Sequence, residues 1–170
     1  MDYHITFWNL ENLFDIEHSP RRTEKLQRAI GSDVKGWGPH QLDQKLEQLN
    51  RIIVQMNNGN GPDILGVCEV ENAHVLNLLI QKMGVLNRNY ALVHADSDDR
   101  RGIDVAFIYD ADLFTIEEEN GEPKVFDHFV LRRTATRDIL QVNFLTKHSQ
   151  GQQRLVVIAN HWPSRSGGQY

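Results

Sequence analysis

Apolar and polar residues follow two different periods along this chain, and the longer period predicts two helices. Over residues 39–56 apolar residues recur at spacings of four, three, four and three, with Pro39 in the expected first turn. A second helix is expected after Asn72, which can cap it, and Gly84 is expected to end it. The apolar positions of the two helices are Leu42, Leu46, Leu49, Ile53 and Met56, then Leu76, Leu79, Ile80 and Met83.

Short apolar runs predict the strands. "YHITFWN" is rich in β-forming residues, and "ILGVCEV" is almost continuously apolar, as in a strand buried on both faces. "YALVHA" and "IDVAFIY" predict two more strands. Two hairpins are expected, one in "LFTIEEENGEPKV" with its turn at Asn120-Gly121, and one formed by "RDILQVNFLT" and "QRLVVIAN". Helices between early strands, followed by hairpins, indicate a mixed α/β fold.

Polar residues gather where several predicted strands end. The pairs are Asn9 and Glu11, Glu69 and Glu71, and Asn160 and His161. In α/β sheets the carboxyl ends of the strands form the edge at which ligands bind. The pattern therefore predicts a polar site at one rim of a sheet.

Composition adds limits rather than a function. A length of 170 residues favours a single domain over 1–170, and the lone Cys68 excludes an internal disulfide. No signal-peptide pattern and no membrane-length apolar run is present, so the protein is either cytoplasmic or exported after signal removal. Residues 1–127 hold 12 Lys/Arg against 22 Asp/Glu, whereas 128–170 hold six against one. This asymmetry suits a site that binds a cation and an anion together, and it is equally compatible with ordinary surface scatter.

Glu69 is the strongest metal-ligand candidate, because a carboxylate at the end of an apolar strand is costly unless it is paired or holds a cation. Mg²⁺ prefers oxygen ligands and needs few from the protein. The alternative for Glu69 is an acid stabilised by a helix N-terminus, which is also the interpretation for Glu71. Glu11 is a second candidate ligand, and the amide of Asn9 can bind a phosphate oxygen or orient a carboxylate.

"NHWPSR" brings several hydrogen-bond donors together after a strand. His161 can donate a proton to a phosphoryl oxygen or a leaving group, and Asn160, Ser164 and Arg165 add donors for one anion. Elsewhere Arg101 or Arg137 can hold a phosphate through two parallel hydrogen bonds. Asp104 can fix the tautomer of a neighbouring histidine. No phosphate-binding glycine loop, serine-hydrolase elbow or zinc-ligand spacing is present.

Four of these segments together carry a family resemblance. "FWNLEN", "PDILGVCEVEN", "RRGIDVAFIY" and "ANHWPSR" occur in an order that resembles the deoxyribonuclease I-like endonuclease/exonuclease/phosphatase superfamily, particularly its bacterial members. The resemblance implies a sandwich of two β-sheets with helices outside. It implies that Glu69 is the main Mg²⁺ ligand, with Mn²⁺ or Ca²⁺ as alternatives, and that Asn9 and His161 lie at the phosphate. It also implies that Asp104 pairs with His161 and that Arg137 contacts phosphate. Glu11 falls on a position that is acidic in some branches of the superfamily, and Ser164 lies near the position of a phosphate-binding amide.

The sequence departs from the superfamily in one respect. The later Gly-Asp-x-Asn and Ser-Asp-His motifs, which supply the water-activating groups, do not occur in these 170 residues. The resemblance therefore implies the N-terminal part of a domain, whose incomplete second sheet would expose apolar surface and favour self-association.

The expected function is Mg²⁺-dependent phosphoester hydrolysis, most simply by an endonuclease-type phosphodiesterase acting on nucleic acid. By itself, this portion of such an enzyme is expected to be inactive. The alternatives are a phosphatase or lipid phosphodiesterase of the same superfamily, and a non-catalytic phosphate-binding relative.

Overall fold

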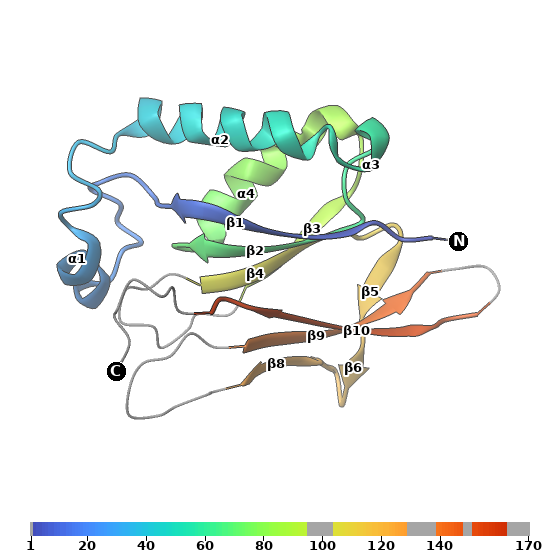
Figure 1. The fold of residues 1–170 in the computed structure, drawn as a ribbon. Helices are drawn as coiled ribbons and strands as arrows, with labels where there is room; N and C mark the ends of the chain where they lie inside the picture. The colour runs from blue at the N-terminus through green and yellow to red at the C-terminus, as the bar shows by residue number, and fades with distance from the viewer. Residues whose placement is uncertain (1, 95–103, 129–138, 148–150, 163–170) are drawn as a thin grey trace, which may run out of the picture.

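A computed structural model describes residues 2–94, 104–128, 139–147 and 151–162 (Figure 1). Four predicted phosphate-contact residues, Arg101, Arg137, Ser164 and Arg165, lie outside the described residues.

Helices and strands alternate early, and strands dominate later, as the sequence predicts. The helices are α1 (Glu24–Ile30), α2 (Pro39–Ile53), α3 (Met56–Gly59), α4 (Ala73–Lys82) and the 3₁₀ turn η1 (Met83–Leu86). The strands are β1 (Ile5–Leu13), β2 (Ile64–Val70), β3 (Tyr90–His94), β4 (Asp104–Asp110), β5 (Phe114–Ile116), β6 (Glu118–Glu119), β7 (Glu122–Pro123), β8 (Val125–His128), β9 (Ile139–Thr146) and β10 (Arg154–Asn160).

The strands form two main sheets that pack face to face, with α2 and α4 over the outer face of the first (Figure 1). The first sheet has the order β1-β2-β4-β3, and only its β1–β2 pair is parallel. The second sheet has the order β10-β9-β5, with β8 also pairing with β9. The predicted two-sheet α/β sandwich with helices outside is therefore confirmed for the described part of the chain.

The helices cover the first sheet through the apolar faces that their periodicity predicts. Leu42, Leu46, Leu49 and Ile53 of α2 are all buried in one core cluster with Leu76 and Leu79 of α4. Asn72 caps α4 by accepting a hydrogen bond from the N–H of Val75 at 3.1 Å, as expected.

The predicted end of α4 at Gly84 is wrong. The helix ends at Lys82, and Gly84 lies inside η1. The left-handed residue that ends this segment is Asn87, with φ 51°. Asparagine adopts this conformation more readily than most residues, so it can end the turn where glycine was expected.

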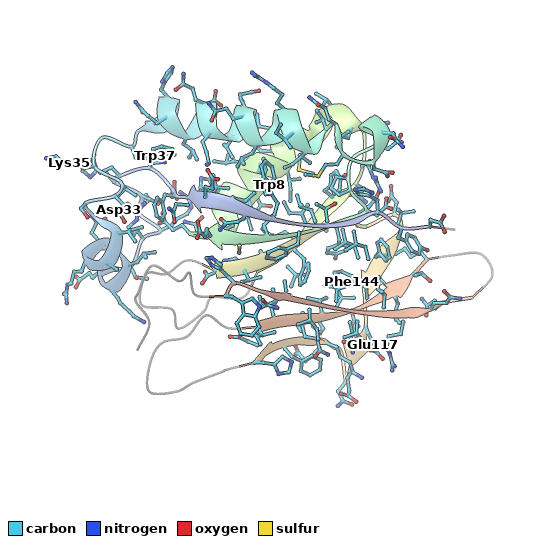
Figure 2. The ribbon with its side chains drawn as sticks, in the orientation of Figure 1. Trp8, Asp33, Lys35, Trp37, Glu117 and Phe144 are labelled. Carbon is cyan, nitrogen blue, oxygen red and sulfur yellow. The ribbon has the colours of Figure 1, made fainter. Side chains whose placement is uncertain are left out.

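A second core lies between the two sheets and is built from aromatic rings. Phe107 of the first sheet meets Phe144 of the second edge to face, with ring centroids 6.1 Å apart. Figure 2 shows Phe144 between the sheets. Gly66 of β2 leaves room for two rings, because an added Cβ would lie 2.8 Å from Phe7 and 3.2 Å from Phe107. The close approach of these rings is the reason for glycine in this strand.

The hairpin turn at Asn120-Gly121 is confirmed. It joins β6 and β7, and both turn residues are left-handed, with φ 55° and 83°. This is the conformation that a two-residue hairpin turn requires. The sequence did not predict β8, which pairs with β9 and widens the second sheet.

Several large apolar side chains are at least one-third exposed on the strands. Ile5 and Phe7 project from β1, while Val156 and Ile158 alternate on β10 with Leu155 and Val157, which pack into the inter-sheet core. Both main sheets therefore carry apolar side chains that the described part of the chain leaves uncovered. Within the described residues, no helix has both the length and the apolar character needed to cross a bilayer.

Candidate active site

Five strands bring their polar ends to one rim of the sandwich. β1 and β2 run parallel and end together, while β4 runs the opposite way and therefore begins there. β3 ends beside the start of β4. β10 ends at the same rim in the second sheet, at the left in Figure 1. Residues from distant parts of the sequence thus meet at the edge where the sequence predicts a site.

The backbone at this rim is irregular on two neighbouring strands. On β2, Cys68 pairs with Val105 and Val70 pairs with Asp104, so Glu69 is the extra residue of a β-bulge. Its φ is 62°, a left-handed value that is uncommon for a residue other than glycine. Because a bulge breaks the alternation of side chains, Val70 packs in the helix-side core with Leu65 and Val67, a face that alternation alone would have given to Glu69. Glu69 is thereby left at the rim.

β1 carries a larger irregularity at the same level. From Asn9 to Leu13, β1 advances four residues while its partner β2 advances only two, from Cys68 to Val70. Within this bulge, Glu11 and Asn12 adopt φ values of 53° and 61°. Backbone conformations of this kind cost about 1 to 3 kcal/mol each and cluster at functional sites. The bulge at the rim explains why the polar residues Asn9, Glu11 and Asn12 interrupt an apolar strand at its end.

Glu69 and His161 meet across the two sheets. The Nε2 atom of His161 lies 3.1 Å from Oε1 of Glu69, and the side chains keep 11% and 16% of their surface exposed. A carboxylate and an imidazole that are partly accessible at a strained rim can act on a bound ligand. The structure therefore brings together the two residues that the sequence ranks first for metal and phosphate.

Asn9 lies beside this pair, since it is the register partner of Cys68. Its Oδ1 accepts a hydrogen bond from the N–H of Glu11 at 2.8 Å. With the carbonyl oxygen used locally, the NH₂ group of Asn9 is the part of the amide that can donate to a phosphate oxygen.

Glu11 has different neighbours from Glu69. It lines two recesses beneath α2 together with Lys45 and Gln48, which belong to α2 on the helix side of the sheet. Lys45 Nζ donates to the carbonyl oxygen of Glu11 at 3.4 Å. Among the described residues, no group of three or more His, Cys, Asp or Glu side chains is arranged to hold a metal.

Asp104 contacts a histidine, His94, at this rim. Its Oδ2 lies 3.0 Å from Nε2 of His94, and both side chains are buried. His94 ends β3 at the same rim, on the strand that neighbours β4. The sequence reasoning did not single out His94, because a histidine that ends a predicted strand shows no partner until the strands are paired.

Glu71 directly precedes Asn72, the N-cap of α4, as expected for an acid at a helix start. Its side chain is fully buried and accepts two hydrogen bonds from Arg22, at 2.9 and 2.7 Å. It also accepts the N–H of Asp15 at 2.8 Å. This ion pair fixes the segment after β1 against the start of α4. A buried carboxylate needs such a cation, but the sequence gives no sign of which arginine supplies it.

Asn160 and His161 are neighbours in sequence and lie at the end of β10. Asn160 pairs with Ile139 of β9, one step after the buried Ala159. Because side chains alternate along a strand, Asn160 belongs to the face opposite that of Ala159. Its predicted role in phosphate binding stays a prediction, as do the roles of the other site residues.

Comparisons with known proteins agree with this architecture. The sequence profile described as "Endonuclease/Exonuclease/phosphatase family" matches residues 4–170. A search of curated proteins gave no significant match.

Three solved structures share the fold at low sequence identity. A family protein from Bacteroides thetaiotaomicron is 16% identical, with a TM-score of 0.54 over 92% of this chain and 50% of its own. The 2′,3′-cyclic phosphatase ANGEL2, in complex with adenosine-2′,3′-vanadate, is 13% identical, with a TM-score of 0.56 over 94% and 41%. The corresponding protein from Bacteroides vulgatus is 13% identical, with a TM-score of 0.50 over 95% and 53%.

The chain spans about half the length of these structures, or less. At such identities they show the fold alone, whereas the profile match covers nearly the whole sequence. Together with the two-sheet sandwich, that match confirms the expected family. The chain belongs to the endonuclease/exonuclease/phosphatase family, whose members are generally phosphoester hydrolases.

Proposed function

We propose that this chain is part of a Mg²⁺-dependent phosphoester hydrolase, of the endonuclease-type phosphodiesterase class. The observation that carries the proposal is the contact between Glu69 and His161 across the two sheets, at a rim where Glu69 is left-handed. A structural ion pair does not require that backbone strain, whereas a carboxylate aimed at a ligand gives a reason for it.

Two side chains at the rim would act as hydrogen-bond donors to the phosphoryl group. The NH₂ group of Asn9 donates to a non-bridging phosphate oxygen, and the imidazole of His161 donates to the same phosphoryl group. Donors fixed in place before the reaction stabilise charge that grows on phosphate oxygens. Arg101, Arg137, Asn160, Ser164 and Arg165 remain the predicted further contacts to phosphate. Asp104, which contacts His94 at the same rim, remains the predicted residue that orients a catalytic histidine.

The donor set fits a weakly held Mg²⁺, because this ion is usually bound by one or two carboxylates, with waters and substrate phosphate completing its shell. Glu69 would hold the ion, since its carboxylate is partly exposed at the rim. A divalent cation held there would supply charge neutralisation and polarisation at the phosphoryl group. Glu11 is a weaker candidate, because it lines a recess beside Lys45 and Gln48 of α2, away from Glu69. Mn²⁺ and Ca²⁺ share the preference for oxygen ligands.

A second candidate within the same chemistry is a phosphatase. ANGEL2, which shares the fold, is described as a 2′,3′-cyclic phosphatase and was solved with adenosine-2′,3′-vanadate. A lipid phosphodiesterase and a non-catalytic phosphate-binding protein are the remaining alternatives. The basic balance of residues 128–170 favours a polyanionic substrate such as nucleic acid.

The test combines turnover with metal binding. We expect little turnover by these 170 residues alone, because they lack the Gly-Asp-x-Asn and Ser-Asp-His motifs. Isothermal titration with Mn²⁺ or Mg²⁺ should nevertheless detect a site that Glu69→Gln abolishes. Any Mg²⁺-dependent cleavage of plasmid DNA or bis(p-nitrophenyl) phosphate should fall by about 100-fold or more in Glu69→Gln, since a carboxylate that holds charge is lost.

The matched control is Glu119→Gln, which removes an exposed carboxylate in β6, away from the rim. It should leave both metal binding and cleavage unchanged. Metal binding or cleavage that survives Glu69→Gln at the level of the unsubstituted protein would exclude the proposed role of Glu69.

A further inference from the structure

A buried ion pair between Arg22 and Glu71 lies where the chain leaves the rim after β1 and β2. The two side chains keep only 1% and 0% of their surface exposed. Glu71 comes two residues after Glu69, and Arg22 belongs to the segment that joins β1 to α1. In Figure 1 that segment lies at the left, next to the ends of β1 and β2. Because both side chains are enclosed, neither can itself contact a substrate.

Every nitrogen of the Arg22 guanidinium donates a hydrogen bond. Nε and Nη2 bind the two carboxylate oxygens of Glu71 as a bidentate pair. Nη2 also donates to the carbonyl oxygen of Asp15 at 2.8 Å, and Nη1 donates to the carbonyl oxygen of Glu17 at 2.7 Å. The planar fork of arginine can serve a carboxylate and two carbonyl groups at once, whereas the ammonium of lysine cannot reproduce this geometry.

The chain segments that follow the two bulges meet at this ion pair. Leu13, which ends the β1 bulge, is the register partner of Val70, and its carbonyl oxygen accepts the N–H of Glu71 at 3.0 Å. The N–H of Asp15 donates to Oε2 of Glu71 at 2.8 Å. Both main-chain groups of Asp15 are therefore fixed, the N–H by Glu71 and the carbonyl oxygen by Arg22.

The bulges need such an anchor because their backbone is intrinsically unfavourable. Glu11, Asn12 and Glu69 all have left-handed φ values. Conformations of this kind persist only when the surrounding structure over-determines them. Strand pairing up to Asn9 fixes the bulges on one side, and the buried ion pair fixes them on the other.

Stability alone does not account for the ion pair, because replacing a buried pair with apolar residues of similar size is often neutral or stabilising. Apolar side chains could not bind the main-chain groups of Asp15, however. We propose that Arg22 is a positioning residue of the candidate site. Acting through Glu71, it holds the bulge of β2 so that the carboxylate of Glu69 faces the ligand. The inference rests on the proposed function, because it takes Glu69 as the metal ligand.

Two variants separate positioning from stability. Arg22→Lys keeps a positive charge beside Glu71 and loses the planar fork. Arg22→Met combined with Glu71→Gln removes both charges together, and the glutamine keeps an acceptor for the N–H of Asp15. Neither variant leaves a buried charge unpaired, so both should still unfold cooperatively in urea, as followed by circular dichroism.

Two readouts, neither of which depends on turnover, then report on the site of the full chain. Without metal, the backbone chemical shifts of Glu69 should move away from left-handed values in both variants. In isothermal titration with Mn²⁺, at a temperature where the variants are folded, affinity should fall about tenfold or more. That is the range for removing a group that orients a metal ligand.

Arg88→Lys is the matched control, because Arg88 joins two carboxylates, Asp63 and Asp110, at the other end of the same sheet. It loses the same planar fork, so it should lower the urea midpoint and leave the Glu69 shifts and the Mn²⁺ affinity unchanged. A merely structural role for Arg22 would make the two lysine variants behave alike.

Unchanged Glu69 shifts in both Arg22 variants would overturn the inference. So would a Mn²⁺ affinity that these variants leave intact, or one that Arg88→Lys lowers as much as Arg22→Lys does. If the unsubstituted chain binds no Mn²⁺, the proposed function fails, while the metal-free shifts of Glu69 still decide whether Arg22 positions the bulge.

Discussion

Two carboxylate sites at opposite ends of the first sheet, the pair Asp63 and Asp110 and the single Glu69, are held in opposite ways. At the end where β2 begins, Asp63 and Asp110 are joined by Arg88, whose Nε donates to Asp110 at 2.7 Å and whose Nη2 donates to Asp63. Each carboxylate also accepts a backbone hydrogen bond. The N–H of His4 donates to Asp63 at 2.7 Å, and the N–H of Asp112 donates to Asp110 at 2.8 Å.

At the other end, Glu69 sits on a left-handed bulge and faces the imidazole of His161. There the backbone carries strain, and no arginine or lysine forms an ion pair with Glu69 in the described part of the chain. The contrast separates a structural carboxylate, satisfied by fixed donors, from one that is available to a ligand. It predicts that the two ends respond differently to substitution.

Arg88→Ala should have the largest effect on stability. It leaves two buried carboxylates without their cation, and breaking a buried ion pair in this way costs about 3 to 5 kcal/mol. Equilibrium unfolding in urea, followed by circular dichroism, measures the loss. A change below about 1 kcal/mol would mean that this end is not the structural anchor of the sheet.

Glu69→Gln should have a much smaller effect on stability. The side chain is partly exposed, and glutamine can still accept a hydrogen bond from His161, so the change should stay within about 1 kcal/mol. The same urea experiment gives the value. A loss as large as that of Arg88→Ala would place Glu69 among the structural carboxylates and remove the contrast between the ends.

Tyr90 makes the structural end sensitive to alkaline pH. Burial, the largest cause, together with nearby carboxylates raises the pKa of Tyr90 to about 12, and its hydroxyl donates to the carbonyl oxygen of Pro62 at 2.8 Å. A raised folded-state pKa stabilises the fold fully below about pH 10 and loses that contribution as pH rises towards 12.

Tyr90→Phe should cost about 1 kcal/mol at neutral pH, for the lost hydrogen bond, and should reduce the decline in stability between about pH 10 and pH 12. Unfolding free energies measured across this range, with tyrosinate absorbance as a second signal, provide the comparison. An identical decline in both proteins would assign the alkaline sensitivity to other groups.

Substituting the exposed apolar residues of the strands is expected to have the smallest effect, a change in self-association. We propose that Phe7 and Ile158, which are 49% and 55% exposed, contribute to self-association. Phe7→Ser with Ile158→Ser should shift sedimentation-velocity profiles towards the monomer, with Val85→Ser, exposed in η1, as the control. A protein that stays monomeric at every concentration tested before substitution would contradict the proposal.

Much of the fold follows from local sequence. The period of Leu42, Leu46 and Leu49 places α2, and Asn120-Gly121 places a hairpin turn, because helix faces and turns depend on residues a few positions apart. The ends of β1, β2 and β10 were likewise visible as switches from apolar to polar residues.

The hydrogen-bond and ion-pair partners of the buried carboxylates could not be predicted from the sequence in the same way. The sequence did not show that Asp104 would contact His94, or that Glu71 at the start of α4 would pair with Arg22. A buried carboxylate requires a cation or a donor, but strand pairing and loop path decide which distant residue supplies it. The sequence by itself determined most of the elements, the family and the polar rim. Only the tertiary structure decided the ion pairs, the left-handed bulge at Glu69 and the recess beneath α2, because each depends on contacts between segments that are far apart in the chain.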